Sequence, residues 1–370
     1  MSAPLTRPQF LETDPAVILQ AMIADFEIAT GRTLQPAQIE QLLINFMAYR
    51  ETLVRLDVQH AAEQNLVAFA DGLNLDNLAA NVGVTRLVAV PAKATQRFTL
   101  SAIQATDTVI PAGTRIKTTD GLQTFATNAE GKVLAGQLYN DLPVTCATPG
   151  VVGNGYAAGA ISNLLDFVPL VLSVSNTDTS NGGIDTEDDE RLRLRVTLAP
   201  TAYGTGGAEE AYRFWALTFG LEILDAVVTS PAGGEIQVAV LTVSGAPSAQ
   251  QLLDLTAYLS AQTRRPVTDT VTVVAANPLA YTIAAALTIY DTFDGPTVLA
   301  AANAAAQALS LDRRRNLGKD LTTTQVINAL SVPGVYDLTL TQPAASLIAG
   351  PSDYCNNTGI TLTIAGTVLG

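Results

Sequence analysis

Apolar residues near the start of the chain recur at the spacing typical of helices. Asp14-Pro15 is a start signal, because Asp can cap free backbone N–H groups and Pro is preset for the first turn. Ile18, Met22 and Phe26 follow at intervals of four residues, on one helical face. We expect this first helix to end at Gly31.

A much longer helix is predicted next, because roughly 35 residues between Gln35-Pro36 and Asp71-Gly72 contain neither Gly nor Pro. Its apolar positions fall on a seven-residue grid, and each grid position has a companion three residues later. This is a heptad seam. The grid residues are Ile39, Phe46, Leu53 and Val67, and the companions are Leu42, Tyr49, Leu56 and Ala70.

One short helix is too small to bury such a seam. The seam either packs on the rest of the same chain or joins a bundle shared with other subunits, and its length favours the bundle. The fourth grid position holds His60, with Glu63 as its companion, so the seam turns polar there. We interpret His60 as a residue that helps to set register. The candidate partner interface comprises Ile39, Leu42, Phe46, Tyr49, Leu53, Leu56 and His60.

From about Lys93 the pattern changes to alternation and turns, which predicts a small β domain up to about Asn181. Helices and strands then interleave. We expect helices near 186–198, 208–218, 249–263, 297–311 and 323–330, and strands near 226–229, 235–243, 270–275, 281–289, 335–341 and 360–364. The predicted fold class is α+β: an N-terminal long-helix region, a small β domain, then α+β units with antiparallel sheets. Domain bounds are expected at 1–90, 91–181, 182–290 and 291–370.

Composition narrows the function classes. The 370 residues are 48% apolar, which suits sizeable cores and leaves open whether some apolar surface faces partner chains. Acids outnumber bases 34 to 20, and a net charge of −14 argues against binding nucleic acid or anionic membranes. Neither a signal peptide nor a spanning helix is evident, so we expect the protein to stay in the compartment where it is made. Cys146 and Cys355 are expected to be ordinary buried thiols.

The acidic run Thr186–Glu190 has two explanations, a metal site or a helix start. The spacing of a calcium loop is absent. Asp185 or Thr186 can cap a helix, and Glu187–Arg191 and Asp189–Arg193 would be favourable i, i+4 pairs. A helix start is therefore favoured.

Other candidates for chemistry are weak. Gly204–Gly207 precedes two glutamates that would repel a phosphate, and Gly318-Lys319-Asp320 lacks the Ser or Thr that would hold magnesium. His60 is the single histidine. We predict no catalytic, cofactor-binding or metal-binding residue. The one basic cluster, Arg313, Arg314 and Arg315, is either a solvated turn or a candidate ring contact that docks on an acidic neighbour.

Several segments, in order along residues 70 to 365, resemble the baseplate J-like family of contractile-tailed phages. The resemblance is carried by Leu75–Ala80 with Gly83–Arg86, Ile110–Thr114, Gly150–Asn154, Asn176 followed by Gly182–Arg195, Arg265–Asp269 and Val332–Asp337. The family usually has Ser where this chain has Asp188.

The resemblance implies a structural role without catalysis or cofactor. Family members form baseplate wedges, in which two copies join one smaller wedge protein through an N-terminal helical bundle. C-terminal domains connect neighbouring wedges into a ring around the hub or spike, next to the sheath initiator, and the ring transmits the trigger for contraction. The expected location is the tail baseplate of the virion, after assembly in the host cytoplasm.

Two other functions compete with the wedge subunit. A tail-associated cell-wall hydrolase would need only two carboxylates in a cleft, but no substrate-binding aromatic residues cluster near the acids, and a peptidoglycan-clearing assay separates the two. A host-binding adhesin would favour a β-rich, repeat-bearing sequence, which the N-terminal helices do not suggest.

Overall fold

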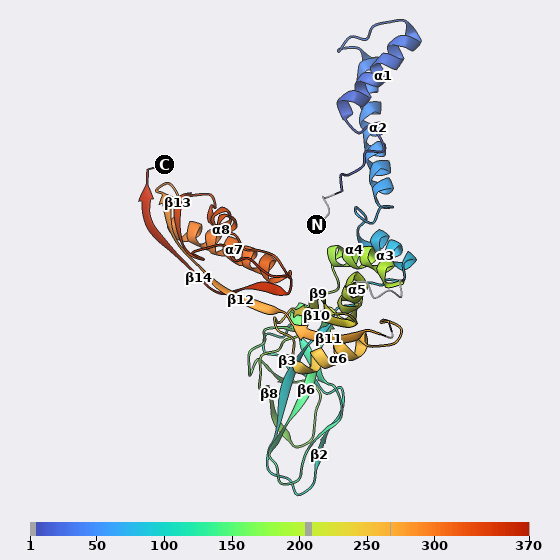
Figure 1. The fold of residues 1–370 in the computed structure, drawn as a ribbon. Coiled ribbons are helices and arrows are strands. Elements are labelled where there is room, and N and C mark those ends of the chain that lie inside the picture. The colour runs from blue at the N-terminus through green and yellow to red at the C-terminus, as the bar shows by residue number, and fades with distance from the viewer. Residues whose placement is uncertain (1–4, 204–208, 267, 370) are drawn as a thin grey trace. The chain divides into compact units, whose positions relative to one another are not determined.

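The computed structural model describes residues 5–203, 209–266 and 268–369, so the Gly204–Gly207 motif and Val267 lie outside the described residues. The chain divides into two compact units (Figure 1). The first comprises Met1–Arg86 and Asp188–Pro200, and the second comprises Leu87–Glu187 and Thr201–Gly370. The predicted α+β fold class is confirmed.

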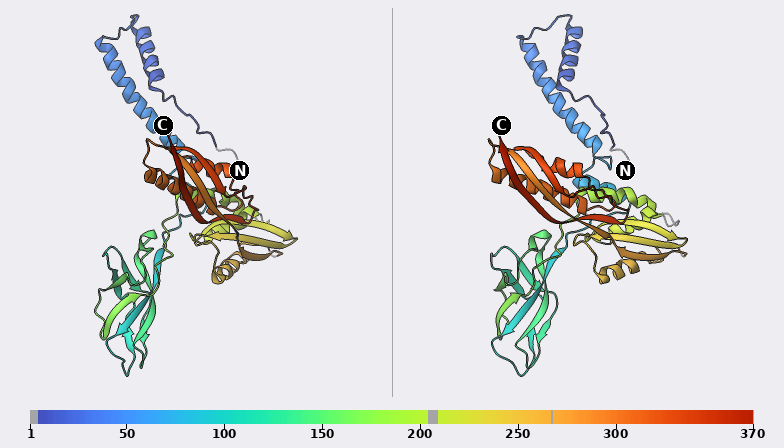
Figure 2. Two further views of the ribbon diagram at one scale, coloured as in Figure 1. Left: turned by 90° about the vertical axis from the view of Figure 1, so that its left-hand side faces the viewer. Right: turned by 60° about the vertical axis from the view of Figure 1, so that its left-hand side comes forward.

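The first unit begins with a helical hairpin, α1 (Pro15–Thr30) and α2 (Ile39–Glu63). As predicted, Asp14 caps α1 by accepting from the Ala16 N–H at 2.8 Å, and Gly31 ends it in the left-handed region. The two helices run side by side in opposite directions (Figure 2).

The predicted 35-residue helix is wrong in length, because α2 ends at Glu63 and turns follow as far as Ala70. A tertiary contact competes with helical hydrogen bonding there. The Arg193 guanidinium donates to the Val67 carbonyl at 2.8 Å and to the Ala70 carbonyl at 2.7 Å. Ala70 is also fully buried. Val67 and Ala70 therefore belong to the packing of α3 (Gly72–Asn81) and α4 (Asp189–Leu198) and not to the seam.

The second unit starts with an antiparallel, nearly closed barrel of six strands in the order β7-β3-β4-β6-β1-β8. Its core holds the alternate residues of these strands, among them Phe98, Ile116 and Phe125. A short ribbon of β2 and β5 adjoins it, and a 3-10 helix, η1 (Val151–Gly153), packs on β1 and β6. The strands are β1 (Pro91–Leu100), β2 (Thr108–Ile110), β3 (Arg115–Thr118), β4 (Thr124–Thr127), β5 (Gly131–Val133), β6 (Tyr139–Pro149), β7 (Ile161–Leu164) and β8 (Val171–Asn176).

The strands β7 and β8 stand at the two ends of the strand order and lie next to each other without a ladder of backbone hydrogen bonds, and Asn176 bridges them. Its buried side-chain oxygen accepts from the Ile161 N–H at 2.8 Å. Its side-chain nitrogen donates to the carbonyls of Ala157 and Asp178 at 2.9 and 2.7 Å. An amide that carries both donors and an acceptor suits this position, because a buried backbone group without a partner is costly.

Two α+β layers follow the barrel. The first, led by a short 3-10 helix η2 (Ala199–Tyr203), has the sheet order β11-β10-β9, and the second has the order β13-β12-β14 with α7 and α8 on one face (Figure 1). The elements are α5 (Glu209–Phe219), β9 (Ile223–Ala232), β10 (Glu235–Thr242), α6 (Ala249–Leu259), β11 (Thr270–Ala275), β12 (Asn277–Tyr290), α7 (Gly295–Arg314), α8 (Thr323–Leu330), β13 (Val335–Gln342) and β14 (Asp353–Val368).

Both sheets are mixed, which corrects the prediction of antiparallel sheets. The neighbours β9–β10 and β12–β13 are antiparallel as expected, but β10–β11 and β12–β14 are parallel. The helix α6 carries the chain back to the end of the sheet at which β10 began, so β11 enters in the same direction. The last strand is also much longer than the predicted 360–364.

Candidate partner interface

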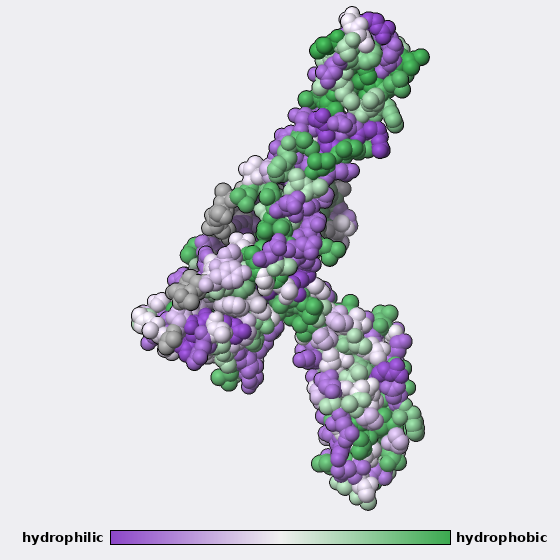
Figure 3. Space-filling model, turned by 90° about the vertical axis from the view of Figure 1, so that its right-hand side faces the viewer, coloured by the Kyte–Doolittle hydropathy of each residue, from purple (hydrophilic) through white to green (hydrophobic). Residues whose placement is uncertain are grey.

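Most of the predicted seam lies on an exposed flank of α2. Phe46 is 64% exposed and Leu42 is 62% exposed. Ile39, Tyr49, Leu56 and His60 are exposed as well, whereas Leu53 is half-buried. Apolar patches gather along the hairpin at the top of the view in Figure 3.

A different face of α2 packs on α1. Ile44, Ala48 and Thr52 are buried there, and Ile18 of α1 is buried with them. The Thr52 hydroxyl donates back to the Ala48 carbonyl at 2.8 Å, which satisfies the one buried polar group of this face. The face consists mostly of small residues, so the hairpin buries little apolar area and a short helix pair of this kind gains much of its stability from further packing.

A second exposed stripe, which the heptad reading missed, lies on the other flank of that inner face. Leu43, Met47, Val54 and Val58 are all about half exposed. At 100° per residue the seam and this stripe lie on opposite sides of the buried face. The signal was present in the sequence as apolar residues next to the seam, but a two-stranded heptad grid assigns only one stripe. The helix therefore exposes apolar surface on two flanks.

The N-terminal segment packs on the polar end of α2 and leaves the seam uncovered. The Gln59 side-chain oxygen accepts from the Phe10 N–H at 2.8 Å, and its nitrogen donates to the Pro8 carbonyl at 2.7 Å. Arg7 lies 3.6 Å from the Glu63 carboxylate. His60, one position from Gln59, remains exposed.

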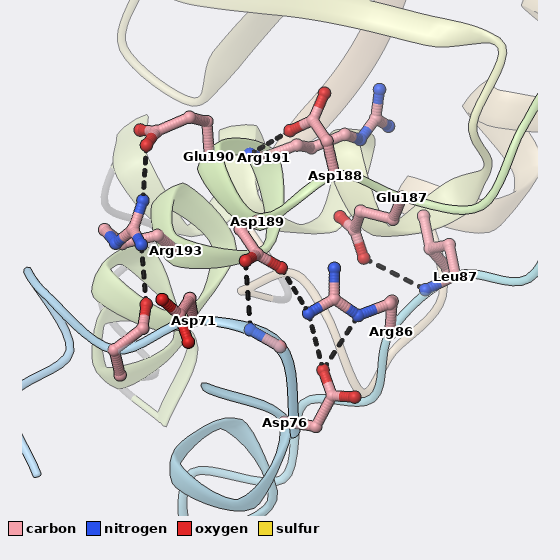
Figure 4. Close-up of polar contacts among 12 residues, drawn as sticks. Asp71, Asp76, Arg86, Leu87, Glu187, Asp188, Asp189, Glu190, Arg191 and Arg193 are labelled. Carbon is pink, nitrogen blue, oxygen red and sulfur yellow. Dashed lines mark hydrogen bonds and ion pairs between the residues drawn. The ribbon is translucent and has the colours of Figure 1, made fainter. Parts of the chain in front are cut away.

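The acidic run starts a helix, as favoured, but three residues later than predicted (Figure 4). Asp188, not Asp185 or Thr186, is the cap, and its carboxylate accepts from the Arg191 N–H at 2.8 Å. Glu187 precedes this cap and lies outside the helix, where its carboxylate accepts from the Leu87 N–H at 2.9 Å. The ion pair of Arg193 is with Glu190, at 2.6 Å, instead of Asp189.

The Asp189 carboxylate, at the start of α4, binds to a segment more than 100 positions earlier in the sequence. It accepts from the Gly72 N–H at 3.0 Å and from the Arg86 guanidinium at 2.7 Å. Arg86 also binds Asp76 at 2.7 Å, so it lies between two carboxylates (Figure 4). The Gly72 N–H and Arg86 lower the pKa of Asp189 below its ordinary value. Burial works against the charge on Arg86, but the two carboxylates outweigh it and raise its pKa.

The basic cluster is only partly available to a partner. Arg313 is half-buried, donates to the Asp320 carbonyl at 3.2 Å and lies 3.4 Å from Asp312. Arg314 is also half-buried, and both residues end α7 instead of lying in a turn. Arg315 is exposed.

Groups suited to chemistry do not converge in the described residues. No cluster of three or more His, Cys, Asp and Glu that could hold a metal ion occurs in them. Cys146 and Cys355 are free and buried, and burial raises the pKa of both thiols. None of the helices within the described ranges is long and apolar enough to cross a membrane.

Comparison with known proteins explains the order of these parts. Four domain models of the baseplate J-like family match in sequence: the N-terminal domain at residues 41–93, the barrel domain at 82–183, the central domain at 204–275 and the C-terminal domain at 281–354. The chain belongs to the baseplate J-like family. It is therefore a structural baseplate protein, and the resemblance noted from its motifs is confirmed.

This baseplate J-like protein is 30% identical to baseplate protein J of Escherichia phage P2 over 164 residues, which is 44% of this chain. The match spans about half, 54%, of the phage protein's length. Among solved structures, a chain of the anti-feeding prophage (AFP) baseplate determined by cryo-EM is similar with a TM-score of 0.46 and 13% identity. That match covers 91% of this chain and 90% of the other.

Proposed function

We propose that this protein is a wedge subunit of a contractile-tail baseplate, and that the two exposed flanks of α2 join it to other chains. The main support for this proposal is that α2 exposes two apolar stripes although its inner face is already buried against α1. Two stripes fit two neighbours, which are a second copy of this chain and a smaller wedge protein. The family to which the chain belongs supports this role.

The remaining domains connect this wedge to its surroundings. The C-terminal α+β layer contacts neighbouring wedges, with Arg315 as the accessible part of the basic cluster, and the ring surrounds the hub or spike beneath the sheath initiator. Rearrangement of the ring transmits the contraction trigger to the sheath. The protein carries no catalytic role of its own and is located in the tail baseplate after assembly in the host cytoplasm.

Burial of the seam against a partner would contribute enough free energy to determine whether the complex forms. Burial of one large apolar side chain contributes about 1.5–3 kcal/mol, and five such side chains on the seam are exposed: Ile39, Leu42, Phe46, Tyr49 and Leu56. A charge at the centre of this stripe removes one contribution and adds a desolvation cost. We expect a loss of at least about 3 kcal/mol, which is more than a hundredfold in affinity.

Phe46→Asp tests this role by co-purification of the full chain with its smaller wedge partner. Phe46 is preferred to the half-buried Leu53, since the substitution leaves the hairpin's inner face intact. Gln20→Asp is the matched control, because it adds the same charge at an exposed position of α1, about 200° around that helix from the buried Ile18 and outside both stripes. Loss of the complex in Phe46→Asp alone supports the proposal. Equal recovery of the complex with both variants would refute it.

A further inference from the structure

The final strand, β14, has a long backbone edge that pairs with nothing in the described part of the chain. It lies at the margin of its sheet and pairs with β12 alone (Figure 1). Only its beginning is covered, where the Asp353 carbonyl accepts from the Gly318 N–H at 2.9 Å. An open edge presents a row of backbone donors and acceptors that another strand can use.

Two of the protections that usually prevent edge pairing, charged residues and prolines, are missing from this strand. Between Tyr354 and Leu369 the sequence has no charged residue and no proline. The opposite edge, β13, carries the exposed Asp337 and is followed directly by Pro343. Charges and prolines on edges are the common devices against association. The two edges of one sheet therefore differ, and only β14 is left open.

Two bulges limit the regular part of β14. The register against β12 shifts once between Asn357 and Gly359 and again between Ile364 and Gly366. The uninterrupted stretch is therefore Gly359–Ile364. Within it, the sequence Ile360-Thr361-Leu362-Thr363-Ile364 reads the same in both directions.

The palindrome has one apolar and one polar face. Leu362 belongs to the core beneath α7 and α8, Ile360 packs against that core, and Ile364 lies next to α7. Thr361 and Thr363 are exposed on the other face. When such a strand meets its own copy in antiparallel direction, Leu362 lies opposite Leu362, Ile360 opposite Ile364 and Thr361 opposite Thr363. Pairs of β-branched residues and pairs of threonines are favourable across strands, and no like charges meet.

We propose that β14 pairs with β14 of a second copy of this chain about a two-fold axis centred on Leu362. The axis stands perpendicular to the sheet, so the two three-stranded sheets become one of six strands with the helices of both copies on the same face. The pair adds about five backbone hydrogen bonds, fewer than the roughly ten of a typical interface. The contact is accordingly weak in solution. This inference rests on the proposed function, because a ring holds neighbouring copies close together and so raises the local concentration at which the contact forms.

Cysteine pairing at defined positions tests the register. Full-length Thr361→Cys and Thr363→Cys are mixed at high concentration with oxidised glutathione. These positions lie opposite each other across the axis, within the Cα separation that a disulfide needs. The same position in the two copies is related diagonally, with the two Cα atoms about 7–8 Å apart, which is too far for a disulfide. We expect disulfide-linked heterodimers of the two variants and few homodimers. The native cysteines are buried and do not compete.

A charge on the edge supplies the second measurement. Adding Thr363→Lys to the Thr361→Cys chain, and mixing it with Thr363→Cys, should lower cross-linking by up to about fivefold, because a threonine pair across the strands is lost. Thr341→Lys, exposed on β13 at the opposite edge, is the matched control and should leave cross-linking unchanged. Equal yields of homodimer and heterodimer, or no effect of Thr363→Lys, would overturn the proposal. The reaction is repeated with Phe46→Asp: cross-linking that persists there separates this contact from the proposed α2 interface.

Discussion

Replacement of Arg86 by Met should loosen the packing of α3 on α4 while leaving the barrel intact. The guanidinium makes three hydrogen bonds to carboxylates, two to Asp76 at 2.8 and 2.7 Å and one to Asp189 at 2.7 Å. A hydrogen bond to a charged group contributes about 1.5–3 kcal/mol. Two of the three share one oxygen, and both carboxylates are about one-third exposed, so screening reduces the sum. We expect a net loss of about 2 kcal/mol.

Hydrogen exchange is the suitable assay, because a chain of several domains need not unfold in one step. A loss of about 2 kcal/mol lowers protection of amides in α3 and α4 about thirtyfold where they exchange through local opening. The pKa of Asp189 is lowered in the folded state, so its contribution is present above its ordinary value near 3.8 and is lost as pH falls through the folded value. The difference between wild type and Arg86→Met should therefore shrink in acid.

The control for this experiment is Arg115→Met, which removes a more exposed ion pair in the barrel. It should leave exchange in α3 and α4 unchanged. Unaltered protection of α3 and α4 in Arg86→Met at neutral pH would show that the bridge contributes nothing and would refute the reasoning.

Two further outcomes are expected in the barrel domain. The Arg115 side chain and backbone N–H hold the pKa of Asp166 at about 2. The Asp166 carboxylate therefore stabilises the barrel fully above pH 3.8, and this stabilisation is lost as pH falls toward 2. Carbon-13 NMR should find the titration of Asp166 near pH 2, and a midpoint near 4 would contradict this. Gly183→Ala should cost about 1–3 kcal/mol in chemical denaturation, because the new Cβ would overlap the Gly150 carbonyl oxygen, whereas Gly233→Ala, which faces open space, should be nearly neutral.

Local signals in the sequence predicted the starts of elements better than their ends. The cap at Asp14 and the stop at Gly31 depend on neighbouring residues alone, and both were predicted correctly. The end of α2 depends on Arg193, which lies about 130 positions later and takes the carbonyls of Val67 and Ala70. Nothing within the helix pattern contains that information.

The acidic run illustrates the same limit at finer scale. Several carboxylates in a row could all cap a helix, and local rules do not rank Asp185 above Asp188. Tertiary contacts decide between them. Asp185 accepts from the Val151 N–H at 2.9 Å, which leaves Asp188 as the cap and Asp189 for Arg86.

The candidate interface was predictable as apolar residues on a helical grid but not as an exposed surface. Periodicity identifies which residues share a face, and the chain's own packing determines which face stays open. Burial of Ala48 and Thr52 against α1 left Phe46 on one flank and Met47 on the other. The local sequence pattern likewise could not predict that β14 runs parallel to β12, because parallel pairing depends on the path of the chain between the two strands.

Cryo-electron microscopy of the assembled particle tests the central claim most directly. If this chain is a wedge subunit joined through its N-terminal hairpin, α2 will lie in a bundle with helices of other chains, and Phe46 and Met47 will both be buried there. A baseplate in which α1 and α2 project into solvent, with both stripes uncovered, would contradict the account.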